Sequence, residues 1–140
     1  MRIASESAVF ILNYVGIGVL PDFGGCYFLP HVVGIGKAMV LAMLGDKFDA
    51  KEAFCTGLVN KIVPDGELMT EARKTAQKLA DLPPLAIGHI KKAIYDLPNK
   101  SLDEALDTEA EYFNYLNGTN DCREGARVFI EKRQPKYTGT

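Results

Sequence analysis

Residues 16–25 read Gly-Ile-Gly-Val-Leu-Pro-Asp-Phe-Gly-Gly, and this run is the most informative stretch of the chain. Gly24 and Gly25 lack side chains, so their backbone amides can approach a ligand closely. Asp22 lies just ahead of a plausible helix start, where the helix dipole favours a carboxylate. On physical grounds Asp22 is either a helix cap, which is the favoured interpretation, or a catalytic acid or base. No third glycine follows at the spacing of a dinucleotide-binding fingerprint.

The rest of the sequence predicts mostly helices. A short polar residue followed three positions later by glutamate indicates capping boxes that begin at Asp49, Ser101 and Asp121. From residue 66 onward, apolar residues recur at the three- and four-residue spacing of amphipathic helices. Strands are predicted only at residues 8–12 and 58–63, so the expected fold class is mainly α with a few short strands. We expect helices near residues 36–44, 50–56, 66–81, 85–96, 102–117 and 122–132.

The composition excludes several classes of protein. The 140 residues include 16 basic and 18 acidic side chains, a balance that argues against a nucleic-acid binder. The longest apolar stretches are shorter than the roughly 20 residues that cross a membrane, and no signal-peptide cleavage site follows them. The three cysteines, Cys26, Cys55 and Cys122, fit neither a disulfide framework nor a metal site. We expect them to be buried small hydrophobic residues of a cytoplasmic protein.

The basic residues near the C-terminus have two interpretations. Residues 129–137 read Phe-Ile-Glu-Lys-Arg-Gln-Pro-Lys-Tyr. Cations at the end of a helix complement its dipole, and this is the favoured interpretation. The alternative is a phosphate-bearing ligand, which lysine and arginine are suited to bind.

An ordered set of motifs runs through essentially the whole chain. It comprises Arg-Ile-Ala-Ser-Glu at residues 2–6, Ile-Gly-Val-Leu-Pro-Asp-Phe-Gly-Gly at 17–25, Tyr-Phe-Leu-Pro at 27–30, Ala53, Gly-Leu-Val-Asn at 57–60, Lys91-Lys92, Asp121, Glu124-Gly125, and the pattern from Phe129 to Gly139. No single piece is decisive, but the series is specific, and it resembles the crotonase superfamily, the enoyl-CoA hydratases and isomerases.

The resemblance is to the C-terminal half of such proteins. It implies that residues 1–82 form the C-terminal part of a ββα spiral core and that residues 83–140 form a helical trimerisation region. In the family, an earlier region supplies most of the acyl-CoA pocket and both amides of the oxyanion hole, so Met1 is expected to fall inside the strand that follows it. The chain would then be a truncated product, an isolated fragment or a sequence with a misassigned start.

The resemblance also implies which residues form a site. Hydratases of the family carry a glutamate at the position of Tyr14, whereas Asp22 matches the aspartate of some isomerases. A tyrosine is a poor substitute for that glutamate, so double-bond isomerisation with Asp22 as the base is expected. Hydrolases of the family share the motif around Asp22 but keep the glutamate, and His31 replaces the arginine that is usual in isomerases. The expected pocket residues are Tyr14, Leu20, Phe23, Gly24 and Gly25.

The expected partners follow from the same family. Phe129 and Lys132 match residues that contact the coenzyme A of a neighbouring subunit. The ligand is then an acyl-CoA thioester, with coenzyme A as part of the substrate and with no metal or redox cofactor. A homo-oligomer is expected, either a trimer or a dimer of trimers, with no nucleic acid and no membrane as a partner. Two alternatives are a non-catalytic oligomerisation module and an inactive fragment that folds only in part.

Overall fold

The computed structural model describes all 140 residues and divides them into two compact units, Met1–Lys74 and Thr75–Thr140. The division falls within helix α4 (Leu68–Ala80). The boundary expected from the resemblance, between residues 82 and 83, stays a prediction.

The strands of the first unit form two small sheets. β1 (Ile3–Ser5) pairs in parallel with β4 (Lys61–Val63), while β2 (Val9–Phe10) pairs antiparallel with β3 (Phe48–Asp49). The backbone N–H of Asn60 donates to the carbonyl oxygen of Arg2 at 2.7 Å, which extends the β1–β4 contact by one residue. Each sheet has only two strands, and such pairs need packing from helices to be stable.

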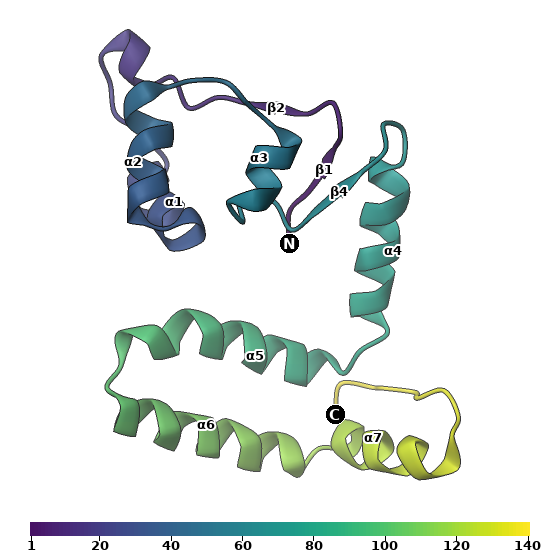
Figure 1. Cartoon of the computed structure of the whole chain (residues 1–140). Coiled ribbons are helices and arrows are strands. Elements are labelled where there is room, and N and C mark those ends of the chain that lie inside the picture. The colour runs from purple at the N-terminus through teal and green to yellow at the C-terminus, as the bar shows by residue number, and fades with distance from the viewer. The chain divides into compact units, whose positions relative to one another are not determined.

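Helices supply that packing in the first unit. After the short 3-10 helix η1 (Val15–Ile17), α1 (Gly25–Val33) packs against α2 (Ile35–Leu44), and α3 (Ala50–Cys55) follows β3 (Figure 1). The core is small, and its members come from strands and helices alike. The buried residues that form it are Ala4, Leu29, Ala38, Leu41, Phe48, Ala50, Ala53 and Val59.

The second unit is a set of helices. α5 (Pro84–Asp96) leads through the 3-10 helix η2 (Leu97–Asn99) to α6 (Leu102–Asn117), which returns antiparallel to it, and α7 (Asn120–Glu131) follows (Figure 1). The His89 ring on α5 lies 5.1 Å and 5.0 Å from the rings of Tyr112 and Tyr115 on α6. No apolar side chain of this unit is fully buried, and its one buried residue is Asp121. The apolar faces that the periodicity predicts are therefore largely exposed.

The expected fold class, mainly α with a few short strands, is confirmed. Helices form at all six predicted places, and the full capping box at Ser101 and Glu104 is present. The box predicted at Asp121 is wrong, because Thr119 caps α7 by accepting from the Cys122 N–H. The three cysteines are exposed in the chain rather than buried.

Five elements lie outside the predicted ranges, namely β1, β3, α1 and the 3-10 helices η1 and η2. The two strands are only two or three residues long, so they carry too few alternating positions to be read. α1 contains Pro30, which argues against a helix interior. None of the helices has the length and apolar character needed to span a membrane.

Candidate functional site

Asp22 lies in an exposed turn just before α1. Its carbonyl oxygen accepts the N–H of Gly25 at 2.8 Å, but its side chain does not cap the helix, because the N-cap residue is Gly24. The interpretation of Asp22 as a helix cap is therefore wrong. None of the four ion pairs of the chain involves its carboxylate. The Asp22 side chain is thus available for another partner.

The two glycines after Asp22 shape this turn. Gly24 has φ of +80°, a left-handed conformation that residues with a Cβ rarely adopt. A Cβ on Gly25 would lie 2.7 Å from the Cβ of Pro21, so the chain packs there in a way that only glycine allows. Pro21 is buried, so the residue directly before Asp22 is anchored in the first unit.

Phe23 has an unusual backbone and an unusual exposure. Its φ of 48° lies in the left-handed region, and its side chain is 96% exposed. A non-glycine residue in this conformation costs stability and persists only where the surrounding structure fixes it. The strain falls directly beside Asp22, and such outliers cluster at ligand-binding positions.

An apolar cavity of about 180 Å³ lies between α1 and α2 and reaches the base of this turn. Two of its lining residues, Pro21 and Gly25, flank the Asp22 turn. Cys26, Met39 and Met43 line it as well, and flexible methionines adapt to ligands of different shape. A volume of this size is below the roughly 300 Å³ of a pocket for a whole small molecule. It therefore suits one apolar group of a ligand rather than a complete ligand.

The other residues expected around Asp22 are placed differently. Leu20 is exposed, and Gly24 is the exposed N-cap of α1. Tyr14 is half-buried at the start of η1, where its carbonyl oxygen accepts the N–H groups of Ile17 and Val19. Of the five expected pocket residues, Gly25 lines the apolar cavity.

The expected coenzyme A residues lie at the end of α7, in the second unit. Phe129 is 87% exposed, and Lys132 follows the last residue of the helix with φ of 52°. Lys132 forms none of the ion pairs of the chain. Phe23 and Lys132 are the two non-glycine residues with positive φ in the whole protein.

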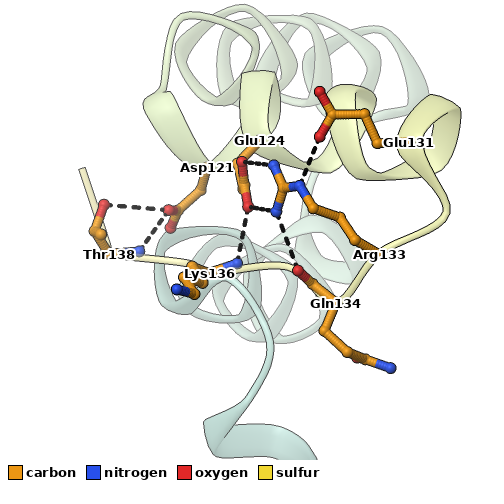
Figure 2. Close-up of polar contacts among 7 residues, drawn as sticks. All are labelled: Asp121, Glu124, Glu131, Arg133, Gln134, Lys136 and Thr138. Carbon is orange, nitrogen blue, oxygen red and sulfur yellow. Dashed lines mark hydrogen bonds and ion pairs between the residues drawn. The ribbon is translucent and has the colours of Figure 1, made fainter.

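Two carboxylates of α7 bind the C-terminal segment, residues 134–140 (Figure 2). Asp121, only 3% exposed, accepts the N–H of Thr138 at 2.7 Å and the N–H of Gly139 at 2.9 Å. Glu124 accepts two bonds from the guanidinium of Arg133, at 2.6 Å and 2.8 Å, and a third from the N–H of Lys136 at 2.9 Å. This is a paired, two-oxygen contact of the strong, charge-assisted kind.

The same contacts set the charges of this cluster. The hydrogen bonds from Arg133 and from the Lys136 N–H lower the pKa of Glu124 from its ordinary 4.5 to about 2. The bonds to Glu124 and Glu131 raise the pKa of Arg133 above its ordinary value. Both partners therefore stay charged at neutral pH. In the sequence, Asp121 and Glu124 form a misleading capping-box pattern and belong to the family motif series, but neither signal predicts that they bind the C-terminal segment.

The family model for enoyl-CoA hydratase/isomerase matches residues 1–140, the full length of the chain. This protein belongs to the enoyl-CoA hydratase/isomerase family. The membership expected from the motifs is thereby confirmed.

Individual relatives agree with the family assignment. The 1,2-epoxyphenylacetyl-CoA isomerase of Escherichia coli K12 is 38% identical over 137 residues, covering 98% of this chain and 52% of that protein. The crotonyl-CoA hydratase of Syntrophomonas wolfei is 38% identical over 136 residues, covering 97% of this chain and 52% of that protein. The chain therefore spans about half the length of the curated relatives it matches.

Solved structures give the same result for the fold. The enoyl-CoA hydratase of Bacillus anthracis superposes with a TM-score of 0.95 at 35% identity, covering all of this chain and 54% of the other. A putative enoyl-CoA hydratase of Streptomyces coelicolor superposes with a TM-score of 0.94 at 35% identity, covering 100% of this chain and 51% of the other. The arrangement of elements described above is thus that of about half of a family member.

Proposed function

We propose that this chain carries the base of an acyl-CoA double-bond isomerase. The observation that carries the proposal is the carboxylate of Asp22, which is exposed, free of ion pairs and presented by a strained turn. The name of the E. coli relative, an isomerase of an acyl-CoA, supports the reaction class. Tyr14 stands where hydratases of the family carry a second glutamate, which argues against water addition.

The proposed reaction moves one proton between two carbons. The Asp22 carboxylate takes a proton from the α carbon of a 3-enoyl thioester, and the electron pair of that C–H bond moves into the thioester to give a dienolate. The protonated Asp22 then returns the proton to the γ carbon, which leaves a conjugated 2-enoyl thioester. The enolate oxygen needs hydrogen-bond donors, which the family resemblance assigns to the half that this chain does not span. One carboxylate suffices as acid and base, so no cofactor is proposed beyond the coenzyme A of the substrate.

The substrate is proposed to be an acyl-CoA thioester with an apolar acyl group. The cavity beside Pro21 and Gly25 would take part of that group, and the exposed side chains of Leu20 and Phe23 would flank it. The coenzyme A part is assigned to Phe129 and Lys132 of a neighbouring subunit through the family pattern.

A homo-oligomer, a trimer or a dimer of trimers, is part of the same proposal. Large apolar side chains remain exposed on the helices of the second unit, and such surfaces are usual at interfaces between subunits. Sedimentation of the purified chain at several concentrations tests this point, since a strictly monomeric chain would contradict it. The side chains concerned are those of Ile90, Ile94, Tyr95, Leu102, Leu106 and Phe113.

The base is tested in a chimera that supplies the other half of the fold. The part of the E. coli relative outside the match is joined to this chain, and conversion of a 3-enoyl-CoA to the conjugated 2-enoyl-CoA is followed by absorbance. Asp22→Asn should lower turnover roughly 10²- to 10⁴-fold at an unchanged melting temperature. Asp46→Asn, a matched change in an exposed loop, should leave turnover unchanged. Full activity of the Asp22 variant, or hydration of a 2-enoyl-CoA as fast as isomerisation, would refute the proposal.

A further inference from the structure

The backbone at Lys132 is held in a conformation that its side chain disfavours. Helices commonly end on a left-handed residue, and glycine usually occupies that position because it has no Cβ. Here α7 ends with Lys132 at φ of 52° and ψ of 40°. The lysine therefore lowers stability relative to glycine, and local packing must maintain its conformation.

The residues on both sides of Lys132 are bonded to each other. The Arg133 Nε donates to Glu131 at 2.6 Å, which bridges across Lys132, and the other nitrogens of Arg133 bond both oxygens of Glu124 (Figure 2). Glu124 lies two turns back along α7 and also accepts the N–H of Lys136. The reversal of the chain at Lys132 is thus fixed on both sides by one guanidinium.

The same arrangement leaves the ammonium of Lys132 free. Two carboxylates of α7 lie close to this turn, and Arg133 bonds both of them. Lys132 consequently has no ion pair in the chain, and the exposed ring of Phe129 lies on the last turn of the same helix. An ammonium without an ion pair and an exposed aromatic ring at the same end of α7 suit a ligand that combines phosphate groups with a planar base.

We propose that Glu124 and Arg133 are positioning residues that hold Lys132 in its left-handed conformation, ready for the phosphate groups of coenzyme A. The inference rests on the proposed function, in which Phe129 and Lys132 contact coenzyme A. It adds that Glu124, although it touches no ligand, changes the affinity for coenzyme A through the conformation of Lys132. If only a fraction of the molecules hold Lys132 correctly, the apparent dissociation constant rises by the inverse of that fraction.

The test joins two measurements. The φ of residue 132 is followed in the chain by the NMR coupling between its amide and α protons, and coenzyme A affinity is measured by titration calorimetry in the chimera that supplies the other half of the fold. Glu124→Gln should reduce the left-handed population of Lys132, and a fall to one fifth should weaken coenzyme A binding about fivefold. Glu109→Gln, a change at an exposed glutamate of α6, should alter neither measurement. Should Glu124→Gln fail to fold, Arg133→Lys takes its place, because lysine keeps the charge but cannot make the two-pronged contact. It should lower the left-handed population of Lys132 and weaken coenzyme A binding, each by less than about fivefold.

A second variant separates this inference from the function on which it rests. Lys132→Gly should keep the turn and raise the melting temperature while weakening coenzyme A binding. If Lys132→Gly leaves the affinity of the chimera unchanged, or if the unaltered chimera does not bind coenzyme A, the contact assigned to Lys132 is wrong and so is the purpose given to Glu124. If Lys132→Gly weakens binding but Glu124→Gln leaves the affinity or the φ of residue 132 unchanged, only the positioning role is refuted.

Discussion

Replacing Asp121 by alanine should loosen residues 138 and 139 of the C-terminal segment, which the Asp121 side chain binds to α7. The carboxylate is buried and accepts two short bonds, from the N–H groups of Thr138 and Gly139. Hydrogen bonds to a charged group contribute about 1.5–3 kcal/mol each, so the pair contributes about 3–6 kcal/mol before any offset. The two residues regain backbone freedom on release, which returns about 1–2 kcal/mol for each of them. The net loss should therefore be about 1–2 kcal/mol.

Hydrogen exchange measured by NMR reports this change at the two amides concerned. In Asp121→Ala, the amides of Thr138 and Gly139 should exchange roughly five to 30 times faster, the factor that corresponds to the expected loss. Asp121→Asn keeps one acceptor oxygen and should show a smaller effect. Asp107→Ala, at an exposed position of α6, is the control. Unchanged exchange of both amides in Asp121→Ala would show that these bonds do not hold the segment in solution.

Two further predictions concern stability. The hydrogen bonds from Arg133 and the Lys136 N–H lower the pKa of Glu124 from 4.5 to about 2. The contribution of these bonds to stability is therefore complete above pH 4.5 and is lost as the pH falls toward 2. The melting temperature should fall through this pH window, and it should fall less steeply in Glu124→Gln. Ala53 is fully buried in the core of the first unit, so Ala53→Leu should cost about 1–3 kcal/mol in urea unfolding. Ala126→Leu, on an exposed part of α7, should cost far less, and equal effects of the two changes would contradict the assignment of the core.

The helices of the second unit could be predicted because their signals are local. At the start of α6, Ser101 and Glu104 form the reciprocal contacts that their spacing predicts. Propensity, capping and apolar period all act over a few residues, so they need no knowledge of distant partners. The strand β1 is the opposite case, since Ile3 pairs with Lys61, 58 positions away in the sequence. A three-residue strand carries no readable period, and only its distant partner defines it.

Asp121 shows how a local signal can mislead. The spacing between Asp121 and Glu124 satisfies the capping-box pattern, but Thr119 occupies the N-cap position and meets the amide of Cys122. Both carboxylates are thereby left free to bind a segment that lies 12 to 18 positions further along the chain. The sequence carries no pattern that links a carboxylate to backbone amides at such distances. The family resemblance named these positions, but the structure was needed to assign their contacts.

Backbone strain and the family pattern are independent indications of function, and they coincide at two residues. The motifs alone place Phe23 beside the proposed base and Lys132 at the proposed coenzyme A contact, and no dihedral angle enters that assignment. The structure finds positive φ in non-glycine residues at these same two positions. A left-handed residue with a Cβ costs about 1–2 kcal/mol, and replacement by glycine would remove that cost. Since both positions keep a large, exposed side chain, the ligand contacts proposed for them would give a physical reason for tolerating the strain.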